Sequence, residues 1–195
     1  MPLHSPEGNG ILLGMSDHRK TLFAHLGRYN RRANNELLGV VAGLTDRALR
    51  RDTGSWFTSI YGILNHIIVA DLYWLNRFKP ISPDSRVLAD PKLSPPNLSW
   101  SHDLCEDLAA LRQSRGFVDE RIIDWFEECP EDRYDARFQY LDSRGTTRDA
   151  VAANAFEFLF VHQIHHRGQI TQVLDALGVP NNIADNGAFL EGAAG

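Results

Sequence analysis

FEFLFVHQIHHRGQITQVLDAL, residues 156–177, is the stretch of this 195-residue chain that decides the fold. In and around it, core-type positions recur at steps of three and four residues, which is typical of an amphipathic helix with one face on a core. These positions are Ala155, Leu159, His162, His166, Gln169 or Ile170, Val173 and Leu177. Because a helical turn takes 3.6 residues, His162 and His166 project about 40° apart on one face. The stretch predicts a long helix that carries two neighbouring imidazoles.

Three further amphipathic stretches predict three more helices upstream. They cover about residues 16–44, 56–78 and 99–128. Prolines punctuate residues 79–100, so this segment cannot be helical throughout. It is also too long for a tight link between neighbouring helices and indicates a crossover. The expected fold class is all-α, a four-helix bundle with a long crossover between helices 2 and 3.

The segment before the last helix differs in character. Alternate positions over residues 134–142 are taken by Tyr134, Ala136, Phe138, Tyr140 and Asp142, and a Ser-Arg-Gly turn follows at residues 143–145. This pattern predicts a short β-hairpin before helix 4. Thr146 or Thr147 is then expected to cap that helix.

The composition indicates one soluble domain, with 43% hydrophobic and 23% charged residues. Residues 1–15 are expected to form a flexible N-terminal arm and residues 16–195 a single domain. The net charge of −5 gives no electrostatic reason to expect nucleic acid, and no apolar run suits a membrane span. No secretory signal is evident, so a cytoplasmic protein is expected. Cys105 and Cys129 are expected on one helix, roughly 36 Å apart and too distant to pair.

A third histidine, His66, lies three residues after Ile63 at the edge of the apolar face of the second helix. Two helices can therefore present three imidazoles to one metal ion. The alternative is a set of hydrogen-bonded core histidines, since an HxxxH pair also arises by chance. Buried imidazoles without a metal would need other polar partners. From the residues alone, both interpretations remain open.

Three segments resemble signatures of the DinB family, a branch of the DinB/YfiT-like superfamily of metal-dependent bundle proteins. YNRRAN at residues 29–34 resembles the family's YNxWAN, with Arg32 where tryptophan is usual. SIYGILNHIIVADLYWL at residues 59–75 resembles the second-helix signature, with its histidine and an aspartate five residues later. HQIHHRGQ at residues 162–169 resembles the HQxHHRGQ signature of the last helix.

The resemblance implies a metal held by His66, His162 and His166 in a four-helix bundle, often a homodimer. Three ligands leave a position open, so metal-bound water or thiolate is expected to react. The expected function is a metal-dependent hydrolase or thiol S-transferase acting on a small molecule, with an external thiol as cosubstrate in the second case. Zinc and nickel are the first choices of ion, and manganese, iron and copper also suit three imidazoles. The alternatives are a non-enzymatic metal or stress-ligand binding protein, and a dimeric interaction module.

Four polar residues are expected to lie behind these ligands. Asn65 and Gln169 are expected to hydrogen-bond near them, and His165 to lie behind them or at the surface. Asp71 lies about 140° around its helix from the histidine, so it is expected to orient a neighbour or pair with Arg167. Gly168, which follows Arg167, is expected to let another helix approach closely.

Overall fold

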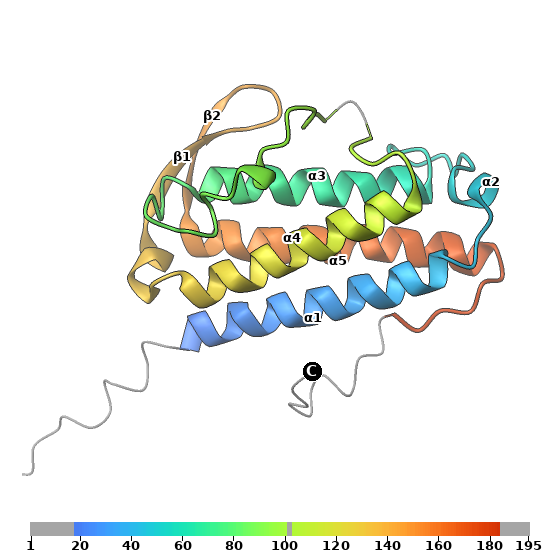
Figure 1. The fold of residues 1–195 in the computed structure, drawn as a ribbon, viewed down its shortest axis with the longest axis horizontal. Coiled ribbons are helices and arrows are strands. Elements are labelled where there is room, and N and C mark those ends of the chain that lie inside the picture. Colours follow the sequence, from blue (N-terminus) through green and yellow to red (C-terminus); the bar gives the residue numbers. More distant parts are fainter. Residues whose placement is uncertain (1–17, 101–102, 184–195) are drawn as a thin grey trace, which may run out of the picture.

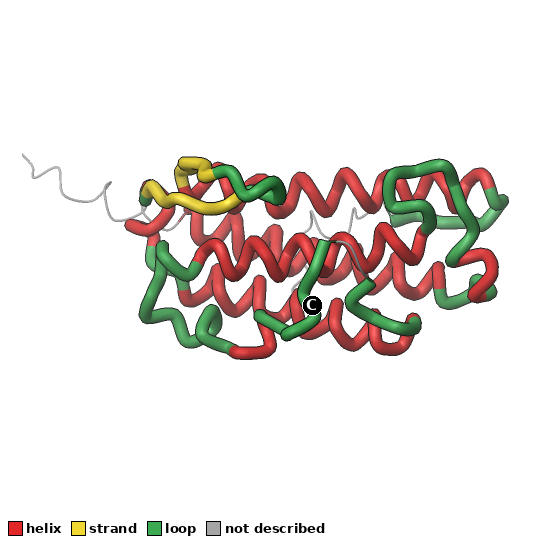
Figure 2. The backbone as a smooth tube through the Cα atoms, turned by 90° about the horizontal axis from the view of Figure 1, so that it is seen from above, coloured by secondary structure: helices red, strands yellow, loops and turns green. Residues whose placement is uncertain are grey.

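The computed structural model describes residues 18–100 and 103–183 and is mainly helical, as predicted. Four long helices lie side by side, and a small two-stranded sheet covers one end (Figures 1 and 2). In chain order the elements are α1 (His18–Val41), α2 (Asp46–Leu49), α3 (Ile60–Phe78), the 3₁₀ helix η2 (Pro91–Leu93), α4 (Leu108–Glu128), the 3₁₀ helix η3 (Glu131–Asp135), β1 (Arg137–Leu141), β2 (Thr147–Val151) and α5 (Ala152–Ala176).

The core lies between the four long helices. α1 packs against α4 and α5, and α3 packs against the same two helices. The α1–α4 contact is close at Gly27, where an added Cβ would lie 3.1 Å from the Ile123 side chain. An aromatic cluster fills the core beside the sheet, with the Phe156 ring 5.0 Å from that of Phe78 and 4.9 Å from that of Trp125. Burial of these large rings is the main stabilising contribution at this end.

The connection between α3 and α4 runs along the molecule. α3 and α4 point in the same direction, and residues 79–100 run back past α3 (Figure 1). Asn76 holds this connection near α3, because its side chain donates to the Leu93 carbonyl at 2.7 Å. Glu128 holds its first part from α4, accepting from the N–H groups of Arg86 and Val87 at 2.8 and 3.2 Å.

α3 begins later than predicted. Its N-cap is Ser59, whose hydroxyl accepts from the Gly62 N–H. Trp56 and Phe57, which were expected to start this helix, lie in the preceding loop. Several serines and threonines could supply a cap hydroxyl, and the sequence pattern alone did not choose among them.

α4 also begins later than predicted, at Leu108 and not near residue 99. Asp107 is its N-cap and accepts from the Ala110 N–H at 2.8 Å. Cys105 therefore precedes the helix, whereas Cys129 is its C-cap, so the prediction that one helix holds both cysteines is wrong. Both cysteines are buried and form no disulfide.

The predicted hairpin is present. β1 pairs with β2 in antiparallel register, with Phe138 opposite Ala150. Its turn contains Gly145 at a φ of +76°, in the left-handed region that favours glycine. α5 follows β2 directly, so Thr147 belongs to the strand and does not cap the helix. The N–H of Ala152 instead donates to a backbone carbonyl, that of residue 136, at 2.9 Å.

Two expectations concern other parts of the chain. The predicted N-terminal arm, residues 1–15, lies outside the described residues. Within the described residues, no helix has the length and apolar character that crossing a bilayer requires.

Candidate metal centre

Three histidines from α3 and α5 converge at one point. The Nε2 atom of His162 lies 3.2 Å from that of His66 and 3.0 Å from that of His166. One ring nitrogen of each residue lies within 4.8 Å of the other two. Nitrogen ligands about 2.1 Å from an ion, at the angles of a tetrahedron or octahedron, stand about 3.0 to 3.4 Å apart. The two short contacts therefore have the separation of neighbouring ligands on one ion.

Hydrogen bonding cannot account for both contacts. An imidazole nitrogen either carries a proton and donates, or carries a lone pair and accepts. The Nε2 atom of His162 faces two other Nε2 atoms, so it can satisfy one of them at a time. The remaining contact would have no proton directed along it, or would set two lone pairs or two protons against each other. A cation among three lone pairs makes both contacts favourable, so the residues fit a metal ion.

The surroundings favour neutral imidazoles. Burial, together with the neighbouring His166 and His162, lowers the pKa of His66 to about 3. Burial lowers the pKa of His162 to about 4, with His166 and His165 contributing. The pKa of His166 is also lowered by burial, against a hydrogen bond to Gln169 that raises it. Neutral imidazole is the protonation state that binds metals.

Gln169 lies behind a candidate ligand. Its Oε1 atom is 2.8 Å from Nδ1 of His166. Because the amide oxygen accepts, this Nδ1 carries the proton and Nε2 keeps the lone pair that faces the other histidines. The Nδ1 atom of His162 is buried without a hydrogen-bond partner among the described residues. His165 is exposed on the outer side, with its ring 5.0 Å from that of His166.

Asn65 anchors the connection before α4. Its hydrogen bonds go to the backbone and not to a histidine nitrogen. Its side chain accepts from the Cys105 N–H at 2.9 Å and donates to the Tyr61 carbonyl at 3.2 Å. These contacts tie the end of the long connection to α3. Among the described residues, Asn65 therefore makes hydrogen bonds to the backbone and none to a candidate ligand.

Asp71 pairs with a different arginine from the one predicted. Its Oδ2 atom accepts from Arg115 at 2.6 Å and from Gln163 at 2.8 Å. Arg167 instead donates to the side chains of Asn30 and Asn34. Asp71 is fully buried, and its role in the structure is to join α3 to α4 and α5.

A buried polar network of seven side chains joins all four long helices. Its members are Asn30 and Asn34 of α1, Asp71 of α3, Arg115 and Asp119 of α4, and Gln163 and Arg167 of α5. On α5, Gln163 directly follows His162 and Arg167 directly follows His166. The network residues and the candidate ligands therefore lie side by side along this helix. The network therefore fixes the rotation of α5 and with it the direction of the histidines.

The network also explains the one departure from the family's first-helix pattern. Asn30 and Asn34 face inward and are 1% and 4% exposed. Arg32 lies on the outer side and forms an ion pair with Glu36 at 2.9 Å. A change at position 32 therefore leaves the inward asparagines in place.

A cavity of about 390 Å³ opens beside His66 and His162. This volume falls within the range of about 300 to 1,000 Å³ that small-molecule sites occupy. Most of its wall is aromatic, formed by Trp56, Phe57, Trp74, Trp100, Tyr140 and Phe158. The polar part of the wall comes from α3 and the hairpin, with Arg77, Asp142 and Ser143.

Phe57 is held against the histidines by a tight turn. Its ring stacks on that of His66, with centroids 3.8 Å apart, and meets His166 edge-on at 5.4 Å. Thr58 has a φ of +60°, which is uncommon for a β-branched residue. A Cβ added to Gly62 would clash with the Phe57 carbonyl oxygen, so glycine is required for this approach. Sequence reasoning missed Phe57 because it assigned this residue to the helix.

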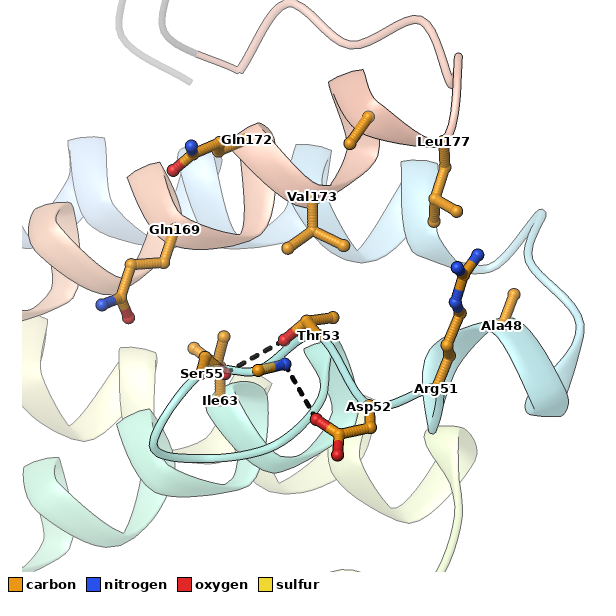
Figure 3. Close-up of a pocket in the computed structure, with 12 residues that line it drawn as sticks. Ala48, Arg51, Asp52, Thr53, Ser55, Ile63, Gln169, Gln172, Val173 and Leu177 are labelled. Atoms are coloured by element: carbon orange, nitrogen blue, oxygen red, sulfur yellow. Dashed lines mark hydrogen bonds between the residues drawn. The ribbon is translucent and has the colours of Figure 1, made fainter.

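A second cavity, of about 530 Å³, lies between α5 and the loop before α3 (Figure 3). Gln169, Gln172 and Val173 line it from α5, and Arg51 and Thr53 line it from the loop. None of the three histidines is among its lining residues. Two of the histidines, His66 and His162, line the aromatic cavity instead.

Comparison with known proteins gives one match. The family model described as DinB family matches residues 15–194, nearly the whole chain. No curated protein and no solved structure matches the chain. The matched region contains every histidine and network residue described above.

Proposed function

The chain belongs to the DinB family, and from that premise we propose that it binds one divalent metal ion through His66, His162 and His166. The observation that carries this proposal is the pair of Nε2–Nε2 contacts, 3.2 and 3.0 Å, which hydrogen bonding cannot satisfy together. Zinc and nickel are the first choices, and manganese, iron and copper also accept imidazole ligands.

The proposed activity is that of a metal-dependent hydrolase or thiol S-transferase acting on a small molecule. Three protein ligands leave at least one coordination position for a group from outside the chain. When bound, a divalent ion supplies Lewis acidity and lowers the pKa of a water or thiol that reaches it. The aromatic cavity beside His66 and His162 offers room for that group and for a substrate.

The chain's own residues prepare the site. Gln169 keeps the proton on Nδ1 of His166, so the Nε2 lone pair points into the site. Phe57 covers one face of His66 and limits the access of water to that ring. The aromatic wall of the cavity can bury the apolar part of a substrate away from water.

A thiol for the transfer reaction comes from outside the chain. Cys105 and Cys129 are both buried. Burial raises the pKa of the Cys105 thiol, and it raises that of Cys129 to about 11. Neither residue lines the aromatic cavity. Protonated, buried thiols are poor nucleophiles, so the cosubstrate is a small external thiol. Two free thiols also accord with a cytoplasmic location.

Elemental analysis followed by an activity screen tests the proposal. The purified protein is expected to carry about one metal ion per chain, since the described residues hold one cluster of three histidines that could bind it. His166→Ala is expected to lose the metal, while His165→Ala, an exposed neighbour, keeps it. A thiol with an aryl halide tests transfer, and a carboxylic ester without thiol tests hydrolysis. A protein without metal would contradict the proposal.

A non-enzymatic metal-binding or ligand-binding protein is the alternative, and one observation favours it. Asp142 is the one carboxylate among the residues that line the aromatic cavity. Its oxygens already accept from Arg148 and from the N–H groups of Arg144 and Thr146. No free carboxylate therefore lines the cavity as a general base. Metal content without turnover in either screen supports this alternative.

The proposal also covers the fold type, a four-helix bundle with a crossover, and the assembly, a homodimer. Each long helix contacts two others, and the long connection joins two helices of the same direction, which supports a four-helix bundle with a crossover. A homodimer is proposed through the outer side of α5. There Phe158, Val161 and Ile164 are 48%, 52% and 48% exposed at a spacing of three residues.

A further inference from the structure

Arg77 lies in the wall of the aromatic cavity and forms no ion pair with a carboxylate among the described residues. One end of its guanidinium donates to the Leu141 carbonyl at 2.7 Å. The guanidinium carbon is 4.8 Å from the centre of the Trp74 ring and 4.9 Å from that of Tyr140. These contacts hold the cation between α3 and β1 while the rest of its hydrogen-bonding edge stays available.

The neighbouring carboxylate does not take up this charge. Asp142 forms its ion pair with Arg148, at 2.9 Å, and also accepts from two backbone N–H groups of its own turn. Burial lowers the pKa of Arg77, and the nearby Tyr140 and Asp142 offset this lowering only in part. A ligand anion would restore the lost interactions as charge-assisted hydrogen bonds.

The aromatic side chains determine what the anion is attached to. Trp100 stacks on Tyr73 with ring centroids 4.3 Å apart and planes 7° from parallel, so its ring is held in place. Trp56 is 92% exposed at the rim, where a ligand could cover it. Flat, rigid rings bind a flat apolar body by stacking and by the burial of apolar area.

We propose that the aromatic cavity takes a small carboxylate with a planar apolar body, whose carboxylate pairs with Arg77 and whose body lies among the tryptophans. The opposite end of such a molecule then faces His66 and His162. The inference rests on the proposed function, because it assigns a substrate class to the same site.

Two probes that differ in charge test the inference. 2-Naphthoate and 2-naphthalenemethanol share one ring system, and calorimetry measures the affinity of metal-loaded and chelator-treated protein for each. 2-Naphthoate is expected to bind about tenfold more tightly in both samples, because the charged hydrogen bond is made by Arg77 and not by the metal. Arg77→Gln is expected to abolish this preference, and Arg77→Lys to keep part of it.

Arg112→Gln is the matched control. Arg112 also donates from a helix to a backbone carbonyl, that of Leu38, at 2.8 Å, but it does not line the cavity. The control is expected to keep the tenfold preference. Equal affinities for the two probes, no binding of either, or a preference that survives Arg77→Gln would overturn the inference.

Metal content measured on the same samples separates this inference from the proposed function. A protein that takes up no metal on loading but binds 2-naphthoate through Arg77 supports the inference and contradicts the metal site. A metal-loaded protein without an Arg77-dependent preference contradicts the inference and leaves the metal site supported.

Discussion

His162 and Gln163 are neighbours in the sequence but belong to different environments. His162 borders the aromatic cavity, whereas Gln163 is fully buried in the polar network. The helical period predicted which histidines share a face, because the direction of a side chain follows from its position on a helix. The period could not reveal the partners that Gln163 has on α1 and α3, which are Asn34 and Asp71.

The first residue-scale prediction concerns pH. The pKa values of His66 and His162 in the folded chain, about 3 and about 4, lie below the ordinary value of 6.5. Between about pH 6.5 and 4 the unfolded chain therefore binds protons that the folded chain does not, and stability falls as pH falls. Thermal unfolding of chelator-treated protein across this range is expected to show the loss. His162→Asn is expected to make stability depend less steeply on pH. An unchanged dependence in that variant would contradict the lowered pKa of His162.

The second residue-scale prediction concerns Gln169. Gln169→Leu removes the acceptor of the His166 Nδ1 proton. Metal affinity is expected to fall about 10- to 100-fold, because such outer hydrogen bonds orient the ligand and fix its tautomer. Competition with a chromogenic chelator measures the change. Gln172→Leu is the control, since Gln172 lies on the same helix and lines the same second cavity as Gln169 (Figure 3). Equal losses in both variants would count against the role of Gln169.

At the scale of elements, the helices and the hairpin were predictable but their first residues were not. Each expected start lay among several serines or threonines that could cap a helix. The observed caps, Ser59 and Asp107, depend on how the preceding loops pack. Arg115 did leave a signal, because it occupies a core-facing position of α4 between Leu111 and Val118. An arginine at such a position indicates a buried partner, which here is Asp71.

Two glycines give the element-scale prediction. Gly62→Ala forces the Phe57 carbonyl away from α3 and is expected to destabilise the protein by roughly 1–3 kcal/mol, with weaker metal binding. Gly168, expected from the sequence to allow a close helix contact, has no atom within 4 Å of an added Cβ, so that expectation is wrong. Gly168→Ala is therefore expected to stabilise α5 by about 0.5–1 kcal/mol. Chemical denaturation distinguishes the two, and equal effects would contradict the close approach at Gly62.

At the scale of the whole molecule, the mainly helical fold followed from periodicity and the family from three short segments. The aromatic cavity did not follow, because its wall combines α3, α5, the hairpin and two loops that are far apart in the sequence. The loop residues Trp56 and Phe57 carried no periodic signal that separated them from α3. The place of Phe57 at the site became clear only from its packing against His66.

The whole-molecule prediction concerns assembly. Val161→Asp combined with Ile164→Asp places charges on the exposed side of α5 and is expected to convert a dimer into a monomer. Sedimentation velocity of both proteins measures the change. Leu22→Asp, at another exposed apolar position, is expected to leave the dimer intact. A wild-type monomer, or a dimer that survives the double substitution, would contradict the proposed interface.

X-ray absorption spectroscopy of the metal-loaded protein tests the metal site most directly. The predicted spectrum shows three imidazole nitrogens at about 2.0–2.1 Å and at least one further light-atom ligand, values expected for zinc. His66→Ala is predicted to reduce the imidazole count to two or to abolish binding, while His165→Ala leaves the spectrum unchanged. A spectrum with fewer than three imidazoles in the wild type, or one that His66→Ala does not alter, would contradict the site.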